Sequence, residues 1–329
     1  MLEFENSVSI GKRNEDVDFY KGLLMWGVIY GHMLAGINRT LDTGSSFLYA
    51  FLTIFDMPFF MILSGFFLKK SLSKKTVIEL LRSRTTMIFV PIVIWTLIAG
   101  QWTIGRYYFL WAVYVSSLIC IFTRILSSLF SNRLGKTVEY LVYVLFIAFT
   151  YFYYVPWNMF YLFPFFIVGY SLDNVSFKVK NLKVAFFLFV VGLCFWTSEY
   201  RPWVMRWNAW DENPFAIVIY VYRFLLALLG VFVMANVFSY LKNVMGGGKI
   251  VLLGRETLAI YILQAFVVER FFSNGLHRLI KNPFALEQYE QNLLGYVVCP
   301  IVSFLVMYLL YKMIVFVKQN KYTRWLFGF

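Results

Sequence analysis

Long apolar runs, separated by short polar or charged stretches, form the main pattern along this chain. About ten of the runs are long enough to cross roughly 30 Å of hydrocarbon as α-helices. The shortest break, at 155–157, separates the fifth run from the sixth. The pattern predicts an all-α, polytopic membrane helical bundle forming a single domain over residues 1–329. The predicted segments lie at 19–37, 47–67, 86–104, 107–126, 138–155, 157–171, 183–198, 215–240, 250–272 and 293–317.

The composition excludes an ordinary soluble domain. Sixty per cent of the residues are hydrophobic and only 14% are charged, whereas a soluble surface needs many more charges. Residues 1–16 are too acidic to open a signal peptide, so we expect them to be retained as an N-terminal segment. Each cysteine lies inside an apolar run, which predicts packing roles rather than disulfides or a metal site. The cysteines are Cys120, Cys194 and Cys299.

Basic residues alternate in density between successive loops. The even-numbered loops hold fourteen Lys and Arg residues and the odd-numbered loops hold seven. Since cytoplasmic loops are the basic ones, both termini are predicted to be cytoplasmic, including the tail 318–329. The net charge of +13 then reflects topology and contact with membrane lipid, and no nucleic-acid partner is expected.

Three ionisable residues interrupt the first apolar run. Lys21 and His32 are eleven residues apart, which on a helix is three turns plus about 20° and a rise of about 16 Å, so they share one face. Asp18 precedes Lys21 by about one turn on nearly the same side. Ionisable groups are costly at lipid depth, so this polar stripe is a candidate functional site.

The loop at 199–214 is rich in aromatic and charged residues, among them Trp203, Arg206 and Trp207. Aromatic faces beside hydrogen-bonding groups suit a carbohydrate acceptor. Tryptophans also anchor membrane proteins at the interface, so both interpretations stay open.

Several motifs follow one another in a recognisable order. Residues 13–22 read RNEDVDFYKG and lead to Gly31-His32; residues 55–67 read FDMPFFMILSGFF; Arg82 and Arg84 precede Pro91; and residues 254–261 read GRETLAIY. Together they resemble the membrane acyltransferase-3 family, and most closely its small branch that O-acetylates sugars. The resemblance spans nearly the whole chain.

This resemblance implies transfer of an acetyl group from cytoplasmic acetyl-CoA to a hydroxyl of an envelope glycan, an exopolysaccharide or its lipid-linked precursor. It also implies a multi-pass protein of the bacterial inner membrane. The reaction needs a base for a weakly acidic hydroxyl, and His32 is the candidate because an imidazole titrates near neutral pH. Asp18 and Lys21 complete the expected catalytic set, with Lys21 pairing with Asp18 or meeting a CoA phosphate or the thioester; a lysine that snorkels to the inner interface explains Lys21 equally well. No metal is indicated by ligand spacing.

The remaining candidates divide between donor and acceptor. Arg82 and Arg84 suit the phosphates of acyl-CoA, because guanidinium groups bind phosphate oxygens in bidentate fashion, and Ser64 offers a small surface beside the acyl chain. Topology and helix packing alone would also explain these residues. Asp56 and Tyr261, with the tryptophans and arginine of 199–214, are expected to bind the acceptor.

Three positions depart from the family pattern. Asp56 and Gln264 stand where histidines are frequent, and Met87 stands where a further arginine is expected after Arg84. Asp56 supplies a carboxylate instead, or changes the choice of acceptor. The loss at Met87 weakens the assignment of the CoA phosphates to this stretch.

Other functions are open on the sequence alone. A transporter or flippase would use the polar stripe to relay protons or bind substrate, although no internal repeat of the transporter kind is visible. Succinyl transfer in place of acetyl, an acyl-histidine intermediate and a homodimer are equally undecided.

Overall fold

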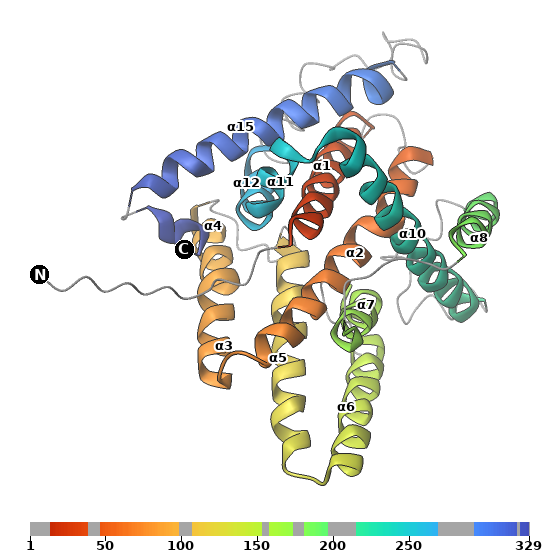
Figure 1. The fold of residues 1–329 in the computed structure, drawn as a ribbon, viewed down its shortest axis with the longest axis vertical. Coiled ribbons are helices and arrows are strands. Elements are labelled where there is room, and N and C mark those ends of the chain that lie inside the picture. The colour runs from red at the N-terminus through yellow and green to blue at the C-terminus, as the bar shows by residue number, and fades with distance from the viewer. Residues whose placement is uncertain are drawn as a thin grey trace, which may run out of the picture.

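The computed structural model describes residues 14–38, 47–98, 107–152, 158–173, 181–196, 215–268, 293–320 and 323–328. In these ranges every regular element is a helix (Figure 1). The helices are α1 (Glu15–Asn38), α2 (Phe47–Leu72), α3 (Val77–Arg84), the π-helical turn η2 (Thr85–Phe89), α4 (Val90–Ile98), α5 (Tyr108–Ser128), α6 (Asn132–Phe152), α7 (Met159–Ser171), α8 (Leu182–Cys194), α10 (Ala216–Met245), α11 (Gly248–Arg255), α12 (Thr257–Val267), the π-helical turn η8 (Leu294–Val298), α15 (Cys299–Gln319) and the 3₁₀ turn η9 (Arg324–Phe327).

The all-α prediction is confirmed, and each predicted apolar segment overlaps a described helix. Within the described ranges, five helices are long and apolar enough to cross a membrane. The pair α11 and α12, bent by 78° at Glu256, makes a sixth if it is counted as one span. The count of ten spans and the cytoplasmic termini stay predictions.

Large apolar side chains cover the outward faces of several helices. Leu141, Leu145 and Phe149 on α6 and Leu305 and Leu309 on α15 are each at least half exposed. A surface of this kind suits lipid rather than water, in keeping with a membrane protein. Of the cysteines, Cys120 and Cys299 are buried as a packing role requires, whereas Cys194 is exposed.

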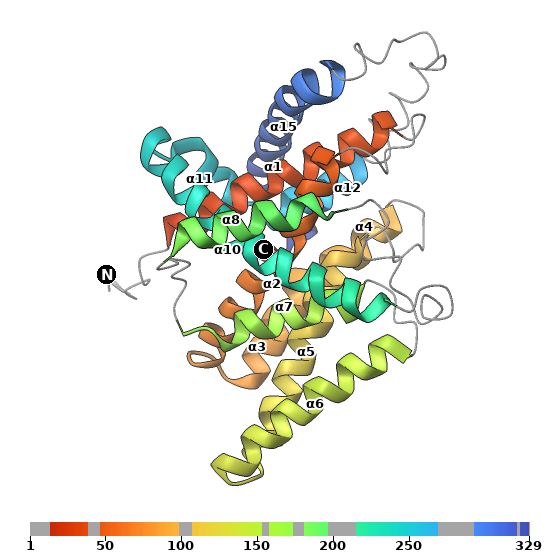
Figure 2. The same ribbon diagram turned by 90° about the vertical axis from the view of Figure 1, so that its right-hand side faces the viewer.

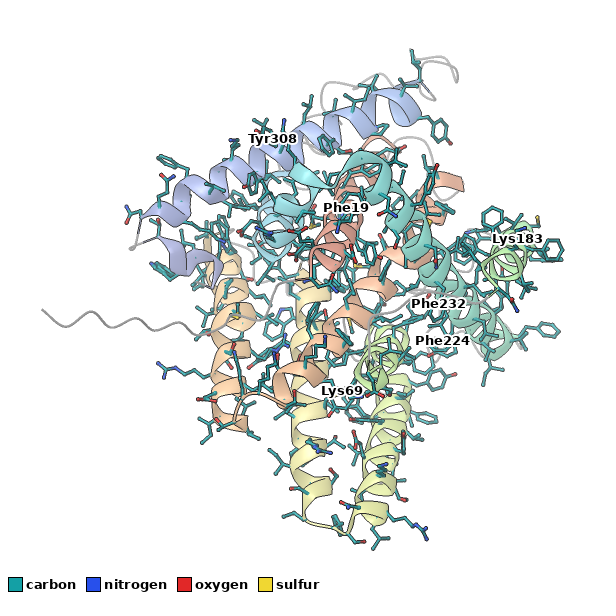
Figure 3. The ribbon with its side chains drawn as sticks, viewed as in Figure 1. Phe19, Lys69, Lys183, Phe224, Phe232 and Tyr308 are labelled. Atoms are coloured by element: carbon teal, nitrogen blue, oxygen red, sulfur yellow. The ribbon has the colours of Figure 1, made fainter. Side chains whose placement is uncertain are left out.

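The helices are arranged around α1 and α2. Along the longest axis of the molecule α15 lies at one end, and α5 and α6 form an antiparallel hairpin that reaches the other end (Figures 1 and 2). Helix α10 packs against α2, and α8 lies on α10 (Figure 2). One cluster of buried apolar residues, which includes Phe19 of α1 (Figure 3), joins these elements.

Glycines allow two very close helix crossings. A Cβ atom on Gly65 of α2 would lie 2.0 Å from the carbonyl oxygen of Phe166, and one on Gly169 of α7 would lie 1.9 Å from that of Ile62. On α11, a Cβ atom on Gly254 would lie 1.6 Å from the carbonyl oxygen of Asp18. Only glycine lets the backbones of α2 and α7, and of α1 and α11, approach this closely.

Both π-helical turns immediately precede a helix that has proline near its start. Pro91 has no N–H for the carbonyl of Met87, and the amide of Val90 instead donates to the carbonyl of Thr85. The same pattern precedes Pro300, where the amide of Cys299 donates to Leu294. Proline therefore widens the helix locally, and the first of these turns lies beside a cavity described below.

The C-terminal turn η9 packs back onto α4. Phe327 is buried and stacks on Trp95, with ring centroids 5.7 Å apart, while the indole Nε1 of Trp95 donates to the carbonyl of Leu326 at 2.9 Å. The predicted tail 318–329 therefore contains a packed turn in its described part.

Candidate active site

His32 and Asp56 line the same cavity, which we name the His32 cavity. It has a volume of about 80 Å³ and lies between α1, α2, α5 and the start of α7. Its polar lining includes a tyrosine, a threonine and an asparagine beside the histidine and the carboxylate. The lining residues are Val28, Gly31, His32, Tyr49, Leu52, Thr53, Asp56, Met57, Pro58, Tyr108, Asn158, Tyr161 and Leu162.

A second, larger cavity contains Lys21 and Arg84, and we name it the Lys21 cavity. Its volume is about 260 Å³, and α1, α2, α5, α12 and the segment from Arg84 into η2 form its walls. The two cationic side chains stand in an otherwise mostly apolar lining. The lining residues are Lys21, Met25, Phe60, Leu63, Ser64, Phe67, Arg84, Met87, Ile88, Phe109, Leu110, Val113, Thr257, Leu258 and Tyr261.

The two cavities approach each other to within about one helical turn. On α1, Met25 lines one and Val28 the other; on α2, Phe60 and Met57 are divided in the same way. Residues three apart on a helix are separated by a rise of about 4.5 Å. Lys21, Met25, Val28 and His32 have the spacing of one helix face, so the predicted stripe on α1 lines both cavities in turn.

The His32 cavity holds a base and an acid in different settings. His32 is half-buried, whereas Asp56 is 5% exposed and its Oδ1 accepts a hydrogen bond from the amide of Met57 at 2.6 Å. Asn158, at the start of α7, has a left-handed backbone with φ of 52°. Asparagine adopts this conformation more readily than other non-glycine residues, so the turn into α7 places Asn158 at the cavity without unusual strain.

The donor candidates separate in the structure. Arg84 is half-buried and lines the Lys21 cavity, whereas Arg82 is exposed and is absent from that lining. The ammonium of Lys21 lies 4.5 Å from the ring centroid of Phe67, a cation–π contact. The hydroxyl of Ser64 donates to the carbonyl of Phe60 at 2.8 Å, so its proton is engaged within α2.

Asp18 and Tyr261 lie away from His32. Asp18 is 2% exposed, and its Oδ2 is 3.6 Å from Nε of Arg255 at the end of α11. It is in the lining of neither cavity. Tyr261, expected at the acceptor, instead lines the Lys21 cavity with the donor candidates, and its ring packs on Phe109. The acceptor candidates Trp203, Arg206 and Trp207 lie outside the described residues.

A basic cavity of about 650 Å³ lies where α2, α5, α6 and α7 meet. Lys69, labelled in Figure 3, is at its edge and lies 2.6 Å from Asp173, and this hydrogen bond lowers the pKa of the Asp173 carboxyl below its usual range. The other cationic side chains in its lining are Lys75, Arg124 and Lys136, with Glu139 as the one acid.

Comparison with known families decides the class of protein. The model of the acyltransferase domain family (Acyl_transf_3) matches residues 14–312. The chain belongs to the acyltransferase-3 family. It is also 27% identical to the nodulation protein NolL of Sinorhizobium fredii (strain NBRC 101917 / NGR234), in a match that covers 34% of this chain and 38% of NolL. No solved structure matches.

Two buried polar residues stand out in this acyltransferase. Gln264 on α12 is fully buried, and neither amide atom has a hydrogen-bond partner among the described residues. Arg223 on α10 is 1% exposed, and none of its guanidinium nitrogens has such a partner within the same ranges. We did not predict Arg223, although an arginine inside the apolar run 215–240 is itself a signal.

The surroundings of Arg223 link it to the His32 cavity. Its guanidinium carbon lies 4.6 Å from the ring centroid of Trp196 and 5.4 Å from that of Tyr161, which lines the cavity. The neighbouring Phe224, labelled in Figure 3, packs on Phe165 of α7, which holds this stretch of α10 against the helix that carries Tyr161. The buried guanidinium thus lies beside Tyr161, a residue of the cavity wall.

Proposed function

We propose that this protein transfers an acetyl group from cytoplasmic acetyl-CoA to a hydroxyl of an envelope glycan, or its lipid-linked precursor, in the bacterial inner membrane. The observation that carries the proposal is the approach of the Lys21 and His32 cavities to within about one helical turn. The Lys21 cavity is cationic and suits an acyl-CoA donor, whereas the His32 cavity contains a base and suits a hydroxyl acceptor. The two substrates would meet where the cavities come closest.

The Lys21 cavity takes the donor. Its lining is mostly apolar, which suits the pantetheine arm and the acetyl group, while Lys21 and Arg84 attract the negative charge of CoA. The basic cavity lined by Lys75, Arg124 and Lys136 lies at the end of α2 beyond Phe67 and offers further cations for the nucleotide phosphates.

The His32 cavity takes the acceptor. The imidazole of His32 accepts the proton of the sugar hydroxyl as that oxygen attacks the thioester carbonyl. A new C–O ester bond forms, the C–S bond breaks, and the proton held by His32 passes to the departing CoA sulfur to give the free thiol. The acetyl group and this one proton are all that pass between the two cavities.

Mass spectrometry of surface glycan tests this proposal. Cells carrying the wild-type chain should show a mass increment of one acetyl group per modified sugar, which cells without the gene lack. His32→Ala should remove the increment while the protein remains inserted at normal abundance, because a general base contributes about 10²- to 10⁴-fold to the rate. Arg133→Met, a change at an exposed position of α6, is the control.

The same experiment separates the alternatives. A larger increment equal to a succinyl group would keep the enzyme class and change the donor. Equal modification in all strains, with the amount or location of the glycan changed instead, would overturn acyl transfer in favour of a transporter.

A further inference from the structure

Arg223 is a buried cation in need of a negative partner. A guanidinium stays charged in proteins and can donate five hydrogen bonds, yet no nitrogen of Arg223 makes a hydrogen bond of good geometry to a described residue, and the Tyr161 side chain is the polar group that interacts with it. The faces of Tyr161 and Trp196 offer only partial compensation by cation–π attraction. Arginine buried inside an apolar span normally faces a partner or a substrate path.

The position of Arg223 relates it to the acceptor cavity. Tyr161 lines the cavity from α7 and has the guanidinium of Arg223 beside its ring, and Asp56 lines the same cavity from α2. A cation therefore lies next to one lining residue, and a carboxyl group is itself part of the lining.

We propose that Arg223, flanked by Tyr161 and Trp196, is a binding subsite for an anionic group on the acceptor, namely a carboxylate or a phosphate. The guanidinium binds the two anion oxygens in bidentate fashion, and the aromatic rings contact the sugar. The acceptor is then oriented with its acid toward Arg223 and its reacting hydroxyl toward His32. This inference rests on the proposed function for the identity of the acceptor as a sugar.

Binding of simple sugars to the purified full-length protein, without any acyl-CoA, tests the subsite. Dissociation constants are measured by saturation-transfer NMR for glucuronate, glucose 1-phosphate and glucose. Wild type should bind at least one of the anionic sugars about tenfold or more tightly than glucose, since a hydrogen-bonded charge contributes about that much. A preference for glucuronate identifies a carboxylate-bearing sugar, and a preference for glucose 1-phosphate identifies the phosphate of a lipid-linked precursor.

Two substitutions test whether the preference for anionic sugars depends on Arg223. Arg223→Met should abolish the preference for anions, and it should fold because no carboxylate bonded to Arg223 is left stranded. Arg133→Met, at an exposed site, should keep the preference. Equal binding of all three sugars by wild type, or an unchanged preference in Arg223→Met, would overturn the subsite.

The two proposals fail separately. If anion preference is absent while His32→Ala still removes acetyl from the glycan, only the subsite is wrong. If the preference depends on Arg223 but no acyl group is ever transferred, the site binds an anionic sugar for another purpose.

Discussion

Arg255 and Asp18 form an ion contact between two segments that the resemblance treats as separate motifs, with Nε of Arg255 3.6 Å from Oδ2 of Asp18. The side chain of Asp18 is 3% exposed and that of Arg255 is 37% exposed. Gly254, immediately before Arg255, lets α11 approach α1 closely enough for this contact. The two motifs therefore meet at one helix crossing. This crossing accounts for Asp18 in the first motif and for Gly254 and Arg255 in the second.

Removing Arg255 should destabilise the protein. Arg255→Met leaves the buried carboxylate of Asp18 without this cation, and the loss should be about 1–2 kcal/mol, because the arginine is partly screened by solvent. Thermal unfolding of the detergent-solubilised chain measures it. In Asp18→Asn/Arg255→Met the loss should be smaller than the sum of the single changes, and strict additivity would show that the contact contributes nothing.

Gly169→Ala should disrupt the crossing of α2 and α7. The new methyl group would lie 1.9 Å from the carbonyl oxygen of Ile62, so the helices must separate at a cost of about 3 kcal/mol or more. Folded yield and unfolding temperature report the effect. Gly248→Ala is a matched control, because a Cβ there meets nothing within 4 Å. Equal stability of both variants would show that the crossing tolerates a side chain.

Arg84 and Arg82 should differ in their effect on the donor. Arg84 lines the Lys21 cavity, so Arg84→Ala should raise KM for acyl-CoA about tenfold with little change in kcat. Arg82 is exposed and outside the lining, so Arg82→Ala should change KM less than about twofold. The kinetics are measured in membranes with saturating acceptor, and a larger effect at Arg82 would place the donor elsewhere.

Asp56→Asn should raise KM for the acceptor about tenfold without raising KM for acyl-CoA. The reason is that Asp56 lines the His32 cavity and not the Lys21 cavity. The asparagine keeps an oxygen that can accept the hydrogen bond from the amide of Met57, so the unfolding temperature should stay unchanged. A variant with unchanged KM for the acceptor would leave Asp56 as a structural residue, and a raised KM for acyl-CoA would place it on the donor side.

Most of the helices and part of the candidate site could be predicted from the sequence. Apolar length predicts the long helices because a span needs a continuous apolar run, and the helix period predicts that Lys21 and His32 share a face. Apolar length misses α3, which lies outside all ten predicted segments, and the 78° bend that divides the segment 250–272 into α11 and α12. The helix period could not show that Lys21 and His32 line different cavities, because the walls that divide these cavities come partly from α2 and α5. Nor could it pair Asp18 with Arg255, because residues so distant in the chain meet only after the helices pack.

Arg223 shows a different kind of limit. Its charge inside an apolar run is visible in the sequence, but the arginine belongs to none of the family motifs. Its significance depends on burial and on the rings of Tyr161 and Trp196, which come from different elements. Sequence order gives no hint of that juxtaposition.

The wall between the two cavities is formed on α1 and α2 by Met25, Val28, Met57 and Phe60, all of them apolar. Such a wall is a poor path for water and dissolved ions, since neither water nor charge is stabilised beside it. An acyl group can therefore pass from the Lys21 cavity to the His32 cavity without making the membrane permeable to ions. Polar substitutions in this wall, such as Val28→Asp, would be expected to make the bilayer leaky to protons even where the two binding cavities are intact.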